Sequence, residues 1–414
     1  MAKLTVKERR LLFVTSFGHF MSHYNMLVFP AIVLPLASVM NLDMVDVLGL
    51  SFMQYLLFGL MALPWGLVGD RLGGKGLTIL MFLGSGMCGL AAAAFMTSPD
   101  RLSLALAGVG LFSAIYHPIG LGLISKGVER VSVGMGYNAI FGGMGLAVAP
   151  LITGIAVWIS GPRLALLVLG TLNLAGIGLL LLLPFEEPSV KQEEVSEGGN
   201  GMLGAFLILL IAMMLGGIAY TGSSVILPSY LQLKGTGMVE VFSGMLGTNL
   251  SGNLVASALT TVVFVVGMLG QYVGGHVGER FEKRYAYLTF HSMCIPAAFL
   301  MAFTQNFLLV GIASIYFFFQ LGMQAIENTL VADYTPRRLH HSAYGVKFVL
   351  TFGVGALAVK MIQFIDSTWG IEAVFTALGI VSVLIVTTII FLIRQTNRVS
   401  AEKCGTVNGV LTAN

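Results

Sequence analysis

Three histidines lie in long apolar stretches, where an ionisable side chain is costly. His19 and His23 belong to the first stretch, and His117 belongs to a later one. Imidazole titrates near neutral pH, so it can bind an anion when protonated or carry a proton. The alternative is that each ring is a neutral group bonded to a backbone carbonyl. A helical rise of about 1.5 Å per residue places all three near the middle of a span, so we expect one shared site.

One acidic and one basic residue also lie inside apolar stretches. Glu327 is the acid, and Lys347 lies at a similar depth in the next stretch. One interpretation is a structural ion pair, because an unpaired charge there is costly. The other makes Glu327 a proton carrier and Lys347 an anchor for a bound solute. Asn138 stands 347 − 138 = 209 positions before Lys347 and is its expected counterpart in an internal repeat.

The composition indicates the kind of element that must position these residues. The 414 residues are 56% hydrophobic and 10% charged, whereas about a quarter of a soluble protein is charged. The net charge of +3 provides no basic surface for nucleic acid. Backbone polar groups must be paired within a bilayer, so spanning segments of this length are helices. We therefore predict an all-α integral membrane protein with twelve transmembrane helices.

The distribution of Lys and Arg predicts the orientation of these helices. If the N-terminus is cytoplasmic, the outer loops hold only Arg101, Arg163 and Lys234, and nearly all other basic residues are inside. The positive-inside rule then places both termini in the cytoplasm. The polar stretch after the sixth segment reads as a flexible linker. The predicted spans lie near 11–38, 47–68, 78–96, 102–125, 134–158, 164–184, 203–230, 254–276, 287–304, 307–330, 342–364 and 372–393. The predicted domains are a six-helix half at 1–185, a cytoplasmic linker at 186–202, a second six-helix half at 203–393 and a cytoplasmic tail at 394–414.

A loop motif occurs twice, which predicts a parallel duplication of the six-helix unit. The motif at 66–75 reappears at 275–284, an offset of 209. Gly136 and Gly345, at the start of two later predicted helices, are also 345 − 136 = 209 apart. We expect the two loops to control conformation rather than bind solute. Their expected functional residues are Gly66, Asp70, Arg71, Gly73 and Lys75 in the first copy, and Gly275, Glu279, Arg280 and Arg284 in the second.

The first loop resembles the signature of the major facilitator superfamily, Gly-x-x-x-Asp-Arg-x-Gly-Arg-Lys. It matches at Gly66, Asp70, Arg71, Gly73 and Lys75, and departs at Gly74, where a basic residue is usual. The resemblance implies two six-helix halves that rock about a central site. It also implies that the first, fourth, seventh and tenth helices line the cavity, which would bring the three histidines together.

Within that superfamily, the chain is similar to the fosmidomycin-resistance group of efflux proteins. The features are His19 and His23 in a first helix with Pro30 and Pro35, and the sequence Tyr116-His117-Pro118. Tyr24 stands near the place where that group has an acidic residue. This likeness adds Tyr24 and Tyr116 to the candidate site residues.

These observations predict a secondary active transporter that moves a small organic, anionic solute by alternating access, coupled to protons. A drug or antibiotic efflux pump of the fosmidomycin-resistance type is the alternative, and a non-transporting membrane sensor or enzyme is a third. No phosphate-binding loop, nucleophile motif or cysteine–histidine ligand spacing occurs. We therefore expect no enzyme activity, no cofactor and no metal site. The expected setting is a monomer in the bacterial cytoplasmic membrane, with a small-molecule solute, protons and lipid as partners and no nucleic acid.

Overall fold

The computed structural model describes residues 4–187, 203–335 and 345–411, and all their regular structure is helical. The first helix group comprises α1 (Val6–Met40), α2 (Met44–Gly49), α3 (Phe52–Leu60), α4 (Ala62–Leu72), α5 (Gly74–Ala94), α6 (Pro99–Ser113), α7 (Tyr116–Gly127), α8 (Val131–Ser160) and α9 (Pro162–Leu182). The second helix group comprises α10 (Leu203–Lys234), α11 (Thr236–Leu246), α12 (Gly252–Arg280), α13 (Lys283–Met301), α14 (Asn306–Tyr334), the π-helix η2 (Val349–Val354), α16 (Leu357–Trp369) and α17 (Ile371–Leu411). Most of the predicted linker, from residue 188 on, lies outside the described residues.

The helices agree with the predicted all-α membrane fold. Among the described residues, ten segments are long and apolar enough to span a bilayer, with α6 and α7 counted as one and the segment of η2 and α16 as another, and the bent pair 44–60 and 62–72 makes an eleventh. Each predicted span corresponds to helix where the structure describes it, and residues 342–344 of the eleventh span lie outside the described residues. The segment predicted at 287–304 is α13, which has 19 residues and begins with the charged Lys283 and Arg284. This helix is not among the segments that are long and apolar enough to span a bilayer. The additional short helix α11 was not predicted.

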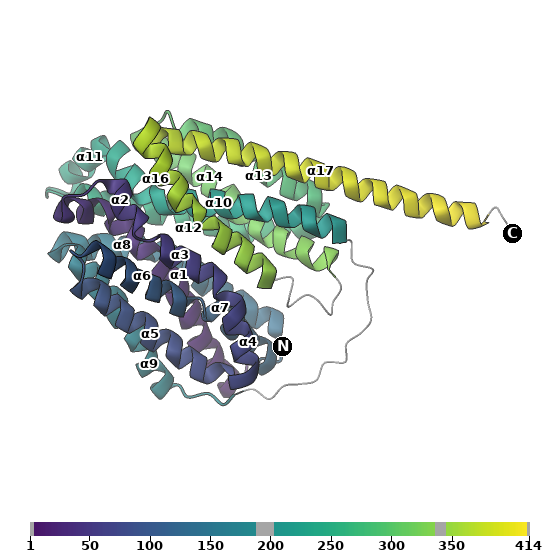
Figure 1. Cartoon of the computed structure of the whole chain (residues 1–414), viewed down its shortest axis with the longest axis horizontal. Coiled ribbons are helices and arrows are strands. Elements are labelled where there is room, and N and C mark those ends of the chain that lie inside the picture. The colour runs from purple at the N-terminus through teal and green to yellow at the C-terminus, as the bar shows by residue number, and fades with distance from the viewer. Residues whose placement is uncertain (1–3, 188–202, 336–344, 412–414) are drawn as a thin grey trace.

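The two helix groups lie side by side along their length, with the first group below the second in Figure 1. The main contacts between them join α8 to α12, α3 to η2, and α1 to α10. The N-terminus and the long extension of α17 lie at one end, and α2 and α11 lie at the other. We call the end that carries the two repeated loops the loop end, and the opposite one the far end.

The two groups approach closely at a pair of glycines beside the cavity-lining residues Phe58 and Phe352. A Cβ atom on Gly59 of α3 would lie 2.1 Å from the backbone nitrogen of Gly353 in η2. Such an approach is open only to a residue without a side chain. Hydrogen bonds between the groups are found toward the far end: Asn253 Nδ2 donates to the Ala31 carbonyl at 2.7 Å, and Gln363 Nε2 donates to Asp46 Oδ1 at 3.0 Å. The far end is therefore closed between the groups.

Candidate functional site

The three predicted histidines meet in the interior of the first helix group. The ring centroids of His19 and His23 are 4.9 Å apart, and that of His117 lies 5.4 Å from the first and 5.2 Å from the second. His23 Nε2 and His19 Nε2 form a hydrogen bond of 3.1 Å. Two rings come from successive turns of α1 and the third from α7, so the cluster joins segments almost a hundred residues apart. We call these three side chains the histidine cluster.

The local sequence explains how α1 and α7 present these rings. The helix that begins the fourth predicted span ends at Ser113, and α7 restarts at Tyr116. Pro118 follows in the first turn of α7, where a missing backbone N–H costs no helical hydrogen bond. On the other side, a Cβ on Gly142 of α8 would lie 2.5 Å from His19 Cε1. Glycine at this position lets α8 pack directly against the His19 ring.

Asn138 and Tyr116 hold the His19 ring in place. His19 Nδ1 lies 2.9 Å from the backbone carbonyl of Asn138. The Tyr116 ring stacks on His19 with centroids 4.7 Å apart, and its hydroxyl donates to Asn138 Oδ1 at 2.8 Å. A carbonyl only accepts, so Nδ1 carries the proton. In the neutral ring, Nε2 then accepts the hydrogen bond from His23.

His117 links the cluster to the second helix group. Its ring stacks on Phe348 at 4.9 Å and meets the edge of Phe58 at 5.8 Å. The side chain is buried, and its Nε2 atom has no hydrogen-bond partner among the described residues. Buried polar atoms are nearly always hydrogen bonded, so this nitrogen is a candidate contact for a bound molecule or ion.

A small cavity opens beside the cluster, between the two helix groups. His23, Tyr55 and Phe58 line it from the first group, and Tyr220, Ser224 and Phe352 line it from the second. It leaves about 30 Å³ for the centres of water-sized molecules, which is room for about two waters. The site is therefore shared between the groups, as an alternating-access mechanism requires.

Tyr24 is a predicted site residue of α1 that the structure does not join to the histidine cluster. It is fully buried and stacks on Phe20 at 5.8 Å. Its hydroxyl has no hydrogen-bond partner in the described parts of the chain. Tyr24 thus packs in the interior of the first group, one helical position beyond His23.

Glu327 and Lys347 form a second buried polar cluster, in the second helix group. Lys347 Nζ lies 2.7 Å from Glu327 Oε1 and donates to Asn328 Oδ1 at 2.5 Å. The Tyr287 hydroxyl donates to Glu327 Oε2 at 2.8 Å. Glu327 is 3% exposed and Lys347 7% exposed. The ion pair that the sequence made feasible is therefore formed, and both carboxylate oxygens are engaged.

His291 was missed by the sequence reasoning, although it lies beside this acid. Its ring contacts the Tyr287 ring edge-on at 4.7 Å. It is fully buried, and within the described ranges neither ring nitrogen has a hydrogen-bond partner. The signal was present, because a histidine inside a predicted span is a functional candidate by default.

The first repeated loop is held by the residues that follow α9. The Glu187 carboxylate accepts hydrogen bonds from the backbone N–H groups of Gly74 at 2.7 Å and Lys75 at 2.8 Å, at the N-terminus of α5. Negative charge is stabilised at that end of a helix. Gly73 has a φ of +81°, which favours glycine. Asp70 of the same loop is exposed, and Glu187 makes this contact.

Gly66, Arg71 and Lys75 lie on the same stretch as Asp70. A Cβ on Gly66 would lie 3.3 Å from Pro118 Cβ. The Lys75 ammonium lies over the Phe185 ring, 5.8 Å from its centroid, and Arg71 is exposed.

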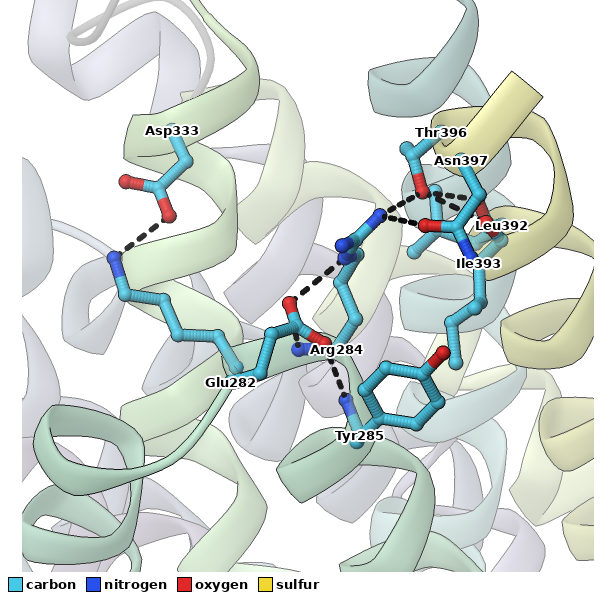
Figure 2. A network of polar contacts seen from close by, with 9 residues as sticks. Glu282, Arg284, Tyr285, Asp333, Leu392, Ile393, Thr396 and Asn397 are labelled. Carbon is cyan, nitrogen blue, oxygen red and sulfur yellow. Dashed lines mark hydrogen bonds and ion pairs between the residues drawn. The ribbon is translucent and has the colours of Figure 1, made fainter. Parts of the chain in front are cut away.

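The second loop is anchored differently, through Arg284 (Figure 2). Its guanidinium donates to Glu282 Oε1 at 2.7 Å, and to Thr396 and Asn397 on α17. Lys283 pairs with Asp333 of α14 at 2.7 Å. These contacts join α13, α14 and α17 at the loop end. Gly275, Glu279 and Arg280 precede this network on α12, and the last two are exposed.

Solved transporter structures share this architecture. A bacterial homologue of the human lysosomal transporter Spinster, in an inward-facing and occupied conformation, is 15% identical, with 94% of this chain and 97% of that chain covered and a TM-score of 0.74. A mutant of the nucleoside transporter NupG is 16% identical, with 93% and 99% covered and a TM-score of 0.71. A peptide transporter in complex with sulfate is 14% identical, with 95% and 94% covered and a TM-score of 0.71. At these identities the likeness shows the fold.

The sequence comparisons agree with the structural ones. No curated protein matches this chain. The sequence profile described as "Major Facilitator Superfamily" matches residues 12–359, which is most of the chain. The finer likeness to the fosmidomycin-resistance group stays a prediction. The superfamily predicted from the first loop is confirmed, and the chain belongs to the Major Facilitator Superfamily of membrane transporters.

Proposed function

We propose that this transporter moves a small organic anion by alternating access and couples its movement to protons. The observation that carries the proposal is the histidine cluster beside the cavity between the two helix groups. Imidazoles donate hydrogen bonds and can carry positive charge, which suits an anionic group. The cavity is lined by both groups, so a solute there would be released when they rock apart.

The balance of buried charge supports an anionic solute. Glu327 is the buried acid of the described residues, and Lys347 is the buried base. The histidine cluster adds three groups that can become cationic, with no carboxylate among the ring contacts. An anion would compensate positive charge at this site, whereas a cation would find no fixed negative charge in the cluster.

Glu327 is our candidate for the proton carrier. Its carboxylate is bound by Lys347 and by the Tyr287 hydroxyl. Protonation would remove the charge that holds Lys347, leaving the ammonium able to exchange its partner for an anionic solute. The pair would then act as a switch in which protonation of Glu327 favours binding of the anion to Lys347, a coupling between two ligands through one equilibrium.

Closure at the far end supports an arrangement that opens toward the loop end. The hydrogen bonds of Asn253 and Gln363 join the groups on the far side of the cavity. In the predicted topology, the loop end is cytoplasmic. Breaking the far-end contacts while the loop ends approach would expose the cavity to the other side.

Reconstitution in vesicles tests this function. Purified protein in proteoliposomes would be given a pH gradient and solutes of similar size, such as citrate and phosphonoacetate as anions, with glycerol and choline as neutral and cationic comparisons. We expect accumulation of an anion that depends on the gradient. Collapse of the gradient should abolish it. The variant His276→Gln replaces a histidine that is exposed on α12, so it should accumulate the anion as the unaltered protein does. Accumulation of the neutral or cationic solutes in place of the anions would contradict the proposed substrate class.

An efflux pump for an amphipathic antibiotic is a second candidate, supported by the cavity lining. Met26, Leu27, Phe58 and Phe352 give it an apolar and aromatic wall next to His23. Such a wall suits a drug that carries one polar group. Expression in a sensitive strain should then raise the concentration of fosmidomycin needed to stop growth. Equal sensitivity with and without the protein would exclude this drug as a substrate.

A further inference from the structure

We propose that His19, His23 and His117 together bind one divalent transition-metal ion of the Zn²⁺, Co²⁺ or Ni²⁺ type, with a fourth position open to the cavity. This goes against the expectation of no metal site, which considered only spacing along the chain. The proposal of a metal site rests on the geometry of the three histidines and does not depend on the proposed function. The further statement that an anionic group of the solute fills the fourth position rests on the proposed function.

The distances suit three ligands of one ion. One ring nitrogen from each histidine can be chosen so that all lie within 4.8 Å of one another. In a tetrahedral site with bonds of about 2.0–2.1 Å, ligand nitrogens stand roughly 3.3–3.4 Å apart. The Nε2 atoms of His19 and His23 are already 3.1 Å apart. His117 needs to approach by no more than about 1.5 Å, which a small ring movement provides.

The donor set selects the class of ion. Three imidazoles suit borderline ions such as Zn²⁺, Co²⁺ and Ni²⁺, whereas Mg²⁺ and Ca²⁺ prefer oxygen ligands. Three protein ligands with one exchangeable position are typical of sites where the ion meets another molecule. A structural site would close the fourth position with a further protein ligand.

The surroundings of the rings provide an independent reason. His19 Nδ1–H is directed at the Asn138 carbonyl, an outer contact typical of metal-bound histidines, and it leaves the Nε2 lone pair for an ion. Within the described chain, His117 Nε2 is buried and has no hydrogen-bond partner. The hydrogen bond between His19 and His23 satisfies the facing nitrogens of those two rings. It leaves the buried Nε2 atom of His117 without an explanation.

Charge balance points to the fourth ligand. Three neutral imidazoles leave the full double charge of the ion uncompensated, and such a charge is costly in an apolar interior. In the part of the chain that the structure describes, the buried acid is Glu327, which is engaged by Lys347. His23 lines the cavity, so the open position faces the space where a solute would lie. An anionic oxygen from the solute would complete both the coordination and the charge.

Titration of purified protein with Co²⁺ tests the metal site without any transport. The affinity tag is removed, metal is stripped with a chelator, and visible absorption reports the coordination of Co²⁺. Calorimetry with Zn²⁺ gives the stoichiometry. We expect about one ion per chain and a Co²⁺ spectrum of four-coordinate, nitrogen-rich type. His23→Gln and His117→Gln should each weaken binding by at least about tenfold.

The controls keep the result decisive. His276→Gln removes an exposed histidine of α12 and should leave binding unchanged. His291→Gln removes a buried histidine outside the cluster and should also leave it unchanged. Gel filtration and melting temperature confirm that each variant is folded. Absence of binding by the unaltered protein, or the same affinity in all four variants, would overturn the metal site.

Addition of phosphonoacetate to the Co²⁺ form tests the fourth position. We expect a shift in the Co²⁺ spectrum as the anion replaces water. An unchanged spectrum at saturating anion would overturn the open position. Binding of Co²⁺ in a protein that accumulates no anion in vesicles would refute the proposed function and leave the metal site standing. The two proposals therefore fail separately.

Discussion

At the scale of single residues, the informative feature is that the histidine and charged side chains of the candidate site occur in two separate clusters. The histidine cluster belongs to the first helix group, and Glu327 with Lys347 belongs to the second. In the histidine cluster, the His19 and His23 rings are hydrogen bonded to each other. In the ion pair, both oxygens of the Glu327 carboxylate are engaged. The role of each cluster is therefore tested by a different substitution.

Substitution of the ion pair separates a structural role from a functional one. Glu327→Gln alone leaves Lys347 without a counter-charge and should cost about 3–5 kcal/mol of stability. The double variant Glu327→Gln with Lys347→Met removes both charges and should recover most of it. If Glu327 carries the proton, the double variant will exchange solute across vesicles but will not accumulate it against a gradient. Full accumulation by the double variant would make the pair structural only.

His117→Gln tests the histidine cluster, and here we expect accumulation and exchange to be lost together. It keeps approximate size and hydrogen-bonding capacity but loses the imidazole. If His117 contacts the solute, accumulation and exchange should fall together, each by about tenfold or more for one lost polar contact of about 1.4 kcal/mol. His276→Gln is again the matched control. Normal accumulation, exchange and melting temperature in His117→Gln would remove this residue from the site.

At the scale of elements, close packing of helices decides which conformations are reachable. Glycines at the contact of α3 with η2 allow the two helix groups to approach closely. The π-helix η2 itself interrupts the eleventh predicted span where it meets α3, and such irregular turns often occur at functional sites. The break between α6 and α7 similarly places Tyr116 and His117 in a first turn.

Gly59→Ala should weaken the contact between α3 and η2 and shift the transporter toward states in which the two groups lie further apart beside the cavity. The added Cβ would lie 2.1 Å from the Gly353 backbone, which cannot yield as a flexible side chain does. Labelling of Val225→Cys in the cavity wall, with the native cysteines replaced by serine, reports the change. A membrane-impermeant thiol reagent should label this cysteine faster than it does in the chain that keeps Gly59. Gly76→Ala is the control, because nothing lies within 4 Å of its Cβ position. Equal labelling in both variants would contradict this account of closure.

Glu187→Gln tests the contact at the N-terminus of α5. The loss of the negative charge should reduce stability by about 0.3–1 kcal/mol. Thermal unfolding at low and high salt measures it, and the difference should shrink as salt screens the charge. Glu186→Gln is the neighbouring control: Glu186 pairs with Lys7 at an exposed position, and that hydrogen bond lowers the pKa of its carboxyl. Equal melting temperatures for Glu187→Gln and the unaltered protein would show that the contact is dispensable.

At the scale of the whole molecule, the testable feature is its orientation in the membrane. The charge distribution predicts that both termini and the linker are cytoplasmic. In a variant without native cysteines, Val195→Cys should react with an impermeant reagent only from the cytoplasmic side, and Arg163→Cys only from outside. Labelling of both from the same side would overturn the predicted topology.

The sequence by itself determined the class of architecture and most of its elements. Long apolar segments must be helical in a bilayer, because their backbone groups have no other partners there. The signature residues of the first repeated loop identified the superfamily, and the recurrence of the loop predicted the duplication. The cost of burying ionisable groups selected His19, His23, His117, Glu327 and Lys347 as candidates. Each of these rules acts locally along the chain, so each can be read without knowledge of the fold.

Only the tertiary structure decided which candidates meet and at what distance. His19 and His23 occupy successive turns of one helix, but the approach of His117 depends on how α7 packs against α1 and on the missing side chain of Gly142. The partner of the α5 N-terminus proved to be Glu187, more than a hundred residues away in sequence. His291 became a candidate through its place beside Glu327. Contacts between distant segments depend on helix packing, which no local pattern specifies.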